Sequence, residues 1–254
     1  MRYAAIALFF LVGQATSKPA FEVATIKRNP SVGVNTTLRV DPGGRVRVAG
    51  APVFWLIAAA YGDARGGLRP EQVVNAPDWL SSERYDINAK AADGEAIGED
   101  TTFIRMRPHL QTLLEERFKL KVHRDTRQLA IYALVRARRD GTLGPGLKQV
   151  SVDCMKEPLK CGFRGGSISR IKADAISSDL LMQLLAGASG RIVVNRTSLE
   201  GPFSVDLEYS PDQTATDKPS VFTAVQEQLG LKLEATRGPV DVVVIDHVER
   251  PTED

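Results

Sequence analysis

The sequence predicts an α+β protein with two duplicated β-α-β-β-α-β-β lobes, each a mostly antiparallel sheet covered by two helices. Three observations support this prediction. Short runs of alternating apolar residues are typical of half-buried strands, and longer runs have apolar residues at helical spacing. The two kinds of run follow one another in the same order twice along the chain.

Residues 1–17 have the features of a secretory signal peptide. Arg2 precedes the apolar run Ala4–Val12, and Ala15-Thr16-Ser17 supplies the small residues that a signal peptidase requires. This run is too short for a membrane-spanning helix, which needs about 20 apolar residues. We expect an exported protein, periplasmic or extracellular, whose mature chain starts at Lys18 and has no membrane span. The alternative, a buried N-terminal strand, leaves Arg2 and the small residues unexplained.

In the first lobe, residues 18–146, each expected element follows a local signal. The turn residues Asp41-Pro42-Gly43-Gly44 precede a strand, Pro52 is typical of a first helical turn, and an apolar stripe runs from Phe103 to Leu114. The expected elements are a strand at Arg45–Val48, a helix at Val53–Tyr61, strands at Gln72–Val74 and Arg84–Ala89, a helix at Thr102–Arg117, and a hairpin of Lys119–His123 with Leu129–Arg136.

The second lobe, residues 147–254, repeats this order. Gly165-Gly166 takes the place of the first turn, Ser177 or Ser178 caps the first helix, and Arg237-Gly238-Pro239 turns the last hairpin. The expected elements are a strand at Ile168–Ile171, a helix at Ser178–Leu185, strands at Ile192–Val194 and Ser204–Glu208, a helix at Ser220–Leu229, and a hairpin of Leu231–Ala235 with Val240–Asp246.

Direct alignment of the two halves supports a duplication. Leu114–Val122 aligns with Val225–Leu233 so that every apolar position stays apolar and Lys121 meets Lys232, an offset of 111 residues. The same offset joins Leu129–Leu134 to Val240–Ile245. Larger offsets, 120 to 124 residues, join Val73–Asn75 to Val193–Asn195, Tyr85–Ile87 to Val205–Leu207, and Ala49 and Ala51 to Ala173 and Ala175.

The chain has two cysteines, Cys154 and Cys161. In an oxidising compartment they are well placed to form a disulfide; two free thiols are the alternative. The bridge closes a short loop, so its stabilisation should lie at the lower end of the usual ~2–4 kcal/mol. No further ligand at zinc-like spacing accompanies them, and we expect no metal site there.

Composition and motifs exclude several functions. The 33 basic and 31 acidic residues are mixed along the chain, which argues against nucleic acid as a partner. The sequence has no serine-hydrolase elbow, phosphate-binding loop or zinc-protease motif. We expect no cofactor, because Gly141, Gly144 and Gly146 lack the dinucleotide-binding order and indicate a linker. His109 and His123 are expected to be structural, since no histidine has a second one at metal-ligand spacing.

Asp78 and Trp79 are the candidate ligand contacts. Trp79 can stack on a sugar, and the nearby Glu83 and Asp86 supply, with Asp78, the carboxylates that glycoside hydrolysis requires. The structural alternative is that Trp79, after Pro77, anchors a turn to the core.

Five motifs carry a resemblance to a known family. They are Phe21–Lys27, Ala76–Leu80, Glu115–Arg124, Gln226–Glu234 and the ending Ile245–Pro251. On these the chain resembles exported, soil-associated proteins of acidobacteria that are described only as a domain of unknown function. The resemblance covers nearly the whole mature chain and implies export and architecture, but no catalytic residues. Related domains joined to membrane sensor peptidases imply a sensing or binding role outside the cytoplasm.

The leading hypothesis is therefore a non-enzymatic envelope or secreted module that binds a protein, peptide or glycan at the junction of its lobes. One alternative is a hydrolase of an envelope polymer, which requires a close, partly buried carboxylate pair among Asp78, Glu83 and Asp86. The other is a sheet-edge adaptor, which requires an exposed unpaired strand near Leu129–Arg136 or Val240–Asp246.

Overall fold

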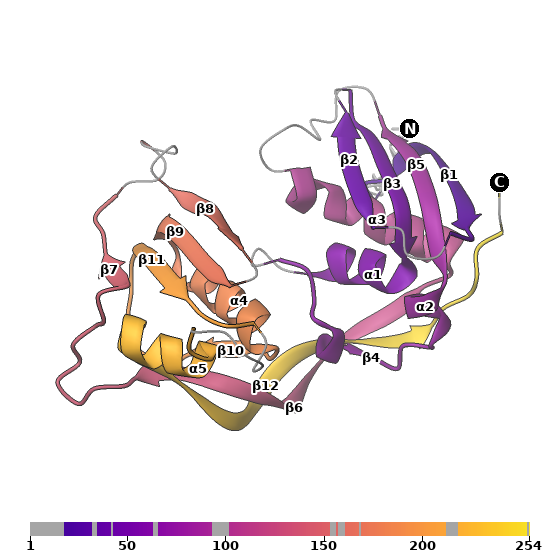
Figure 1. Ribbon diagram of the computed structural model, residues 1–254. Helices are drawn as coiled ribbons and strands as arrows, with labels where there is room; N and C mark the ends of the chain where they lie inside the picture. The colour runs from indigo at the N-terminus through magenta and orange to yellow at the C-terminus, as the bar shows by residue number, and fades with distance from the viewer. Residues whose placement is uncertain are drawn as a thin grey trace, which may run out of the picture. The chain divides into compact units, whose positions relative to one another are not determined.

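The protein has a mixed α+β fold, as expected (Figure 1). The computed structural model describes residues 18–31, 35–41, 43–62, 66–92, 102–152, 156, 161–167, 169–211, 218–252 and 254. These residues include three four-stranded sheets. The expected signal peptide, residues 1–17, lies outside the described residues, and so does Cys154. Among the described residues no helix is long and apolar enough to cross a membrane.

The chain divides into two compact units, neither of which is one continuous stretch. Unit 1 comprises Met1–Ala60, Trp79–Leu120 and Val248–Asp254, and unit 2 comprises Tyr61–Asp78 and Lys121–His247. These units are defined by contacts, whereas the expected lobes 18–146 and 147–254 are defined by repeats. The lobe boundaries therefore stay a prediction.

Unit 1 contains an antiparallel sheet in the order β1-β5-β3-β2. Its elements are β1 (Phe21–Asn29), β2 (Thr37–Asp41), β3 (Arg45–Pro52), α1 (Val53–Tyr61), α2 (Trp79–Ser82), β5 (Arg84–Ala91) and α3 (Thr102–Arg117). Along β3, Val46 and Val48 are buried while Arg45 and Arg47 are exposed, the alternation typical of a sheet with one covered face. The bounds of α1 and α3 confirm the two predicted helices.

Unit 2 contains a second antiparallel sheet, in the order β7-β11-β9-β8. Its elements are β7 (Leu147–Gln149), β8 (Gly162–Ser167), β9 (Arg170–Ile176), α4 (Ser178–Ser189), β11 (Phe203–Glu208) and α5 (Val221–Ala224), which continues as a π-helical stretch at Val225–Leu229. Ser177 caps α4 by accepting a hydrogen bond from the Leu180 amide at 3.2 Å. Leu185, Phe203 and Leu229 bring α4, β11 and the π-helical stretch into one buried cluster.

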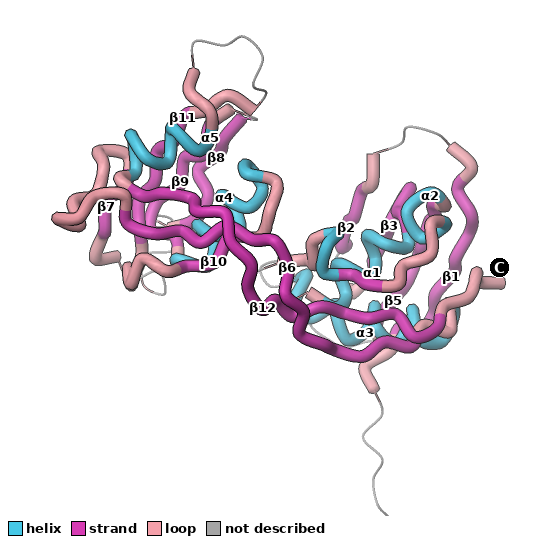
Figure 2. Tube along the Cα trace, turned by 90° about the horizontal axis from the view of Figure 1, so that it is seen from below, coloured by secondary structure: helices cyan, strands magenta, loops and turns pink. Residues whose placement is uncertain are grey.

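The third sheet, also in unit 2, is built on two long strands. β6 (Lys121–Arg136) and β12 (Leu231–His247) pair antiparallel along their whole length, and Figure 2 shows them side by side. The short strand β4 (Val73–Val74), which follows the 3-10 turn Pro70–Gln72, lies parallel to β12, and β10 (Val193–Asn195) lies parallel to β6. The sheet order is β10-β6-β12-β4.

The two predicted hairpins are wrong. Lys121 to Arg136 is one strand, and the predicted turn Arg237-Gly238-Pro239 lies inside β12, where Gly238 is opposite Leu129. Glycine and proline permit a turn but do not require one. A partner strand 95 to 126 residues away satisfies the backbone groups that a local hairpin would have paired.

The predicted turn at Gly165-Gly166 is also wrong, because both glycines lie inside β8. The turn falls a few residues later, where Ser167 is opposite Arg170. Gly165 has a φ of 117°, which favours glycine, and it lies where the register between β8 and β9 shifts.

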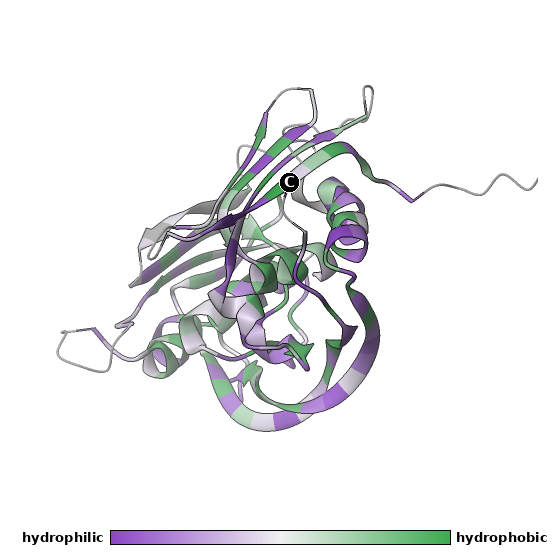
Figure 3. Ribbon diagram, turned by 90° about the vertical axis from the view of Figure 1, so that its right-hand side faces the viewer, coloured by the Kyte–Doolittle hydropathy of each residue, from purple (hydrophilic) through white to green (hydrophobic). Residues whose placement is uncertain are grey.

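Hydrophilic and hydrophobic residues alternate along many of the strands (Figure 3).

Candidate functional site

Trp79 and Glu83 lie on one side of the single helical turn α2 in unit 1. The Glu83 amide donates to the Trp79 carbonyl oxygen at 2.9 Å, so the two residues stand one turn apart. Asp78 precedes the turn and is exposed, whereas Trp79 is half-buried. The helical turn therefore places a half-buried indole and a carboxylate close together.

Arg250 completes a cluster with these two side chains. Its guanidinium carbon lies 4.9 Å from the centroid of the Trp79 ring, which is a cation–π contact. Its Nε and Nη2 atoms donate to Glu83 Oε1 at 2.9 and 2.8 Å. We call Trp79, Glu83, Tyr85 and Arg250 the tryptophan–arginine cluster.

Tyr85 and Arg28 also contact the Glu83 carboxylate. The Tyr85 hydroxyl donates to Glu83 Oε2 at 3.1 Å, and Arg28 Nη2 lies 3.8 Å from Glu83 Oε1. The Glu83 side chain is only 12% exposed, while that of Arg250 is 58% exposed. The carboxylate is thus built into the unit, and the guanidinium covers it from the solvent side.

Two pKa values in the cluster are shifted. The hydrogen bond from Arg250 lowers the pKa of Glu83. Burial raises this pKa, but the hydrogen bond from Tyr85 and the charges of Arg250 and Arg28 lower it further. Burial, followed by the hydrogen bond to Glu83, raises the pKa of Tyr85 to about 12. Glu83 is therefore ionised at neutral pH and unsuited to act as a general acid.

Asp86 has a structural role. Its Oδ1 atom accepts from Asn29 Nδ2 at 2.9 Å and from the Gly50 amide at 2.8 Å. Gly50 has a φ of 62° and lies where the register between β3 and β5 shifts. Asp86 thus fixes an irregularity of the sheet, and Glu83 is paired with arginines. The carboxylate pair that the hydrolase hypothesis requires stays a prediction.

The described residues of Val248–Asp254, which we call the C-terminal segment, lie along unit 1. The Glu249 amide donates to the Phe118 carbonyl oxygen at 2.7 Å, and Arg250 enters the cluster. Asp254 reaches the edge strand β1: its Oδ2 accepts from the Ile26 amide at 3.0 Å, and its own amide donates to the Ile26 carbonyl oxygen at 3.3 Å.

Arg117 of α3 holds the last residue of this segment. Its Nη2 atom donates to both carboxylate oxygens of Asp254 at 2.6 Å, and this interaction lowers the pKa of Asp254. Sequence reasoning identified Trp79 but missed Arg250 and Asp254, because 167 residues separate Arg250 from Glu83 and 228 separate Asp254 from Ile26. The motif Ile245–Pro251 was the available signal.

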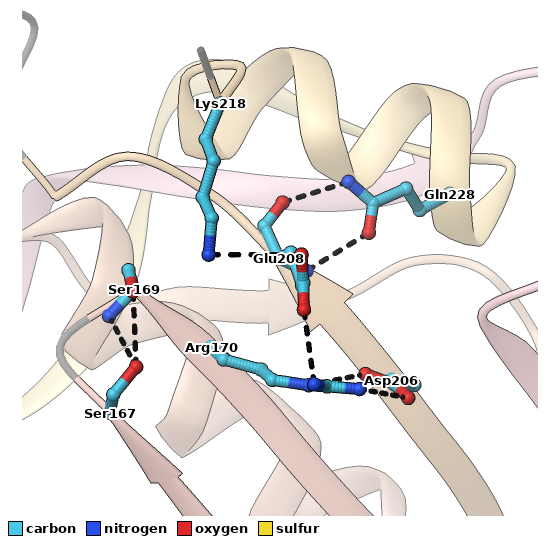
Figure 4. Close-up of polar contacts among 7 residues, drawn as sticks. All are labelled: Ser167, Ser169, Arg170, Asp206, Glu208, Lys218 and Gln228. Atoms are coloured by element: carbon cyan, nitrogen blue, oxygen red, sulfur yellow. Dashed lines mark hydrogen bonds and ion pairs between the residues drawn. The ribbon is translucent and has the colours of Figure 1, made fainter. Parts of the chain in front are cut away.

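A second polar network lies in unit 2 (Figure 4). Arg170 donates to both carboxylate oxygens of Asp206 at 2.9 and 2.7 Å and pairs with Glu208 at 3.0 Å. Lys218 Nζ lies 3.7 Å from Glu208 Oε2. The side-chain amide of Gln228 accepts from the Glu208 main-chain amide at 2.9 Å and donates to the Glu208 carbonyl oxygen at 2.7 Å. Two cations meet two carboxylates, so the network joins β9, β11 and the π-helical stretch with balanced charge.

The glycine loop predicted as a linker packs against that π-helical stretch. The amides of Gly144 and Gly146 donate to the carbonyl oxygens of Leu229 and Gln228 at 2.9 and 2.8 Å. A side chain at Gly144 would collide with the Gln228 carbonyl. These glycines therefore allow a close backbone approach. Among the described residues, no group of three His, Cys, Asp or Glu side chains could hold a metal ion.

The remaining predicted features have mixed outcomes. The adaptor hypothesis places an exposed unpaired strand at Leu129–Arg136 or Val240–Asp246. β10 pairs with Tyr132–Leu134 of β6, and β4 pairs with Val243 and Val244 of β12, so each segment has a second partner strand over part of its length. The adaptor role stays a prediction. Cys161 is not a free thiol, but Cys154 lies outside the described residues, and their pairing stays a prediction.

Together, the fold and the cluster define a mixed α+β protein that holds an extended chain segment on the surface of unit 1. The chain belongs to the family described as "Protein of unknown function (DUF3738)", whose model matches residues 55–248. No curated protein and no solved structure gave a significant match. The predicted membership of a family of unknown function is confirmed, and the association with soil and acidobacteria stays a prediction.

Proposed function

We propose that this protein is an exported, non-enzymatic module that binds an extended peptide segment of a cell-envelope protein at the tryptophan–arginine cluster. One observation carries the proposal: the surface already holds an extended segment, Val248–Asp254, by contacts that peptide-binding domains use. These are main-chain pairing at the edge of β1 and charged side chains anchored in preformed partners.

Export is supported by the signal features of residues 1–17. Lys18 pairs with Glu115 at 2.6 Å, and the Thr112 hydroxyl donates to the Pro19 carbonyl oxygen at 2.7 Å. A chain that starts at Lys18 therefore keeps the contacts that join its first residues to α3. The intact mass of the protein recovered from the envelope or medium of its host should correspond to cleavage after Ser17.

We also propose that the architecture arose by duplication. In the third sheet Val73 is opposite Val243, and Val193 is opposite Tyr132. The sequence alignment matches Val73 with Val193 and Val243 with Tyr132. The pair Val73–Val243 in one repeat arrangement is therefore equivalent to the pair Val193–Tyr132 in the other. Gln128 is likewise opposite Pro239, its own counterpart at the offset of 111 residues.

The two outer sheets support the same proposal. The orders β1-β5-β3-β2 and β7-β11-β9-β8 become identical when β5 is matched with β11 and β3 with β9, as the sequence alignment does. All neighbours in both sheets are antiparallel. β1 and β7, and β2 and β8, then extend the repeat beyond the elements that periodicity predicted.

The binding role is tested by site-specific photo-crosslinking in the native host. A photo-reactive residue at exposed Asp78 should crosslink an envelope protein through one defined peptide, and Trp79→Ala should reduce that product at least about tenfold. The same photo-reactive residue at exposed Lys148 of β7 is the control. Equal amounts of crosslinked product at both positions would contradict a binding site at the cluster. A crosslinked glycan would show that the ligand is a glycan and not a peptide.

A further inference from the structure

We infer that the C-terminal segment is a displaceable occupant of this site, and that the site takes peptides with an arginine followed four residues later by a carboxylate. The inference rests on the proposed function and adds the chemistry of the ligand and a competitor within the chain. Arg250 and Asp254 are the two anchors, and their spacing defines the ligand.

The receiving groups come from parts of unit 1 that do not depend on the segment. Glu83 and Trp79 are held by the helical turn α2, and Tyr85 fixes Glu83 from β5. Arg117 belongs to α3, and Ile26 is fully buried in β1. Both subsites thus keep their partners in place when the segment leaves.

The two subsites differ in charge, which sets the direction of a bound peptide. Glu83 and Trp79 offer a carboxylate and an indole to one side chain and select a guanidinium, because that group can stack on the ring and donate two hydrogen bonds at once. Arg117 and the Ile26 amide offer donors and select a carboxylate. A peptide placed in reverse would set like charges against each other at both ends.

The segment is held by groups that are open to solvent. The side chains of Arg250 and Asp254 are 58% and 39% exposed, and ion pairs of this kind are weak. A tethered segment still competes strongly, because tethering gives it an effective concentration of the order of millimolar. A free peptide should therefore bind well only after the anchors of the segment are removed.

The experiment uses the full chain with both anchors removed, R250A/D254A, and a labelled synthetic peptide with the sequence of residues 248–254 as the probe. Fluorescence anisotropy should show saturable binding to the double variant, and at least about tenfold weaker binding to the wild-type chain. A peptide with arginine replaced by glutamine should lose at least about tenfold in affinity.

Glu83→Gln added to the double variant should abolish most of the binding, whereas Asp179→Asn, at an exposed position on α4 in unit 2, should not. Circular dichroism establishes that each variant is folded. No saturable binding to the folded double variant, or equal binding by the Glu83 and Asp179 variants, would overturn the inference. A crosslinked partner at Asp78 without peptide binding would overturn this inference alone, and peptide binding without a partner would overturn the proposed function alone.

Discussion

Glu83 is the residue on which the site depends. Its carboxylate accepts hydrogen bonds from Arg250 and Tyr85 and forms an ion pair with Arg28, although the side chain is only 12% exposed. Replacing its charge would leave these donors around a neutral amide, which accepts more weakly. Asp86, three residues further along, has sheet-forming partners instead. Two carboxylates close in sequence thus have different roles, and only their contacts distinguish them.

The lowered pKa of Glu83 predicts a pH dependence. A carboxyl group whose pKa is lower in the folded state stabilises the fold above its unfolded pKa, and this contribution is lost as the pH falls through the folded value. The free energy of unfolding should therefore decrease as the pH falls below the ordinary value of 4.5. Glu83→Gln should show a smaller decrease in urea titrations at neutral pH and at about pH 3.

Glu116→Gln is the matched control, because Glu116 is exposed on α3. Its pH dependence should match that of the wild-type chain. If both variants responded to acid in the same way, the ion pairs at Glu83 would not contribute to stability.

At the scale of elements, β6 and β12 differ most from the local signals in the sequence. Gly238 and Pro239 favour a turn, and the nearby residues Glu234, Ala235 and Arg237 are exposed. The strand nevertheless continues because β6 pairs with it on both sides of this region. Gly238 is buried and faces Ile131, whose Cδ1 atom takes the space that a side chain at 238 would need.

This packing predicts the cost of a single methyl group. Gly238→Ala should lower the free energy of unfolding by about 1–2 kcal/mol through overpacking against Ile131. Ile131→Val removes the Cδ1 atom, so the cost of Gly238→Ala should fall to less than half in that background. Urea unfolding of the four chains in a double-mutant cycle measures the coupling. Additive effects would show that Ile131 is not the obstacle.

At the scale of the molecule, the two compact units are interleaved in sequence. Tyr61–Asp78 lies between segments of unit 1 but belongs to unit 2, because β4 adds to β12. Val73 of β4 and Val193 of β10 are both buried, and each pairs with a long strand of the third sheet. Both should therefore stabilise unit 2.

Val73→Ala and Val193→Ala should each cost about 2 kcal/mol, from lost burial and the cavity that remains. Hydrogen exchange should become faster in unit 2 in both variants, by similar factors if the repeats are equivalent. Val48→Ala, at a buried position of β3 in unit 1, should instead accelerate exchange in unit 1. Faster exchange of unit 1 in Val73→Ala would contradict the assignment of β4.

The sequence by itself determined the mixed α+β class, the bounds of α1 and α3, the family membership and Trp79 as a surface aromatic residue of interest. These features depend on periodicity and on motifs whose residues are close together in the chain. Tertiary structure alone decided that two predicted hairpins are one pair of long strands, and that Arg250 and Asp254 complete the site. Such pairings join residues at least 95 positions apart, and no local pattern specifies which distant groups will satisfy a strand, a carboxylate or an indole.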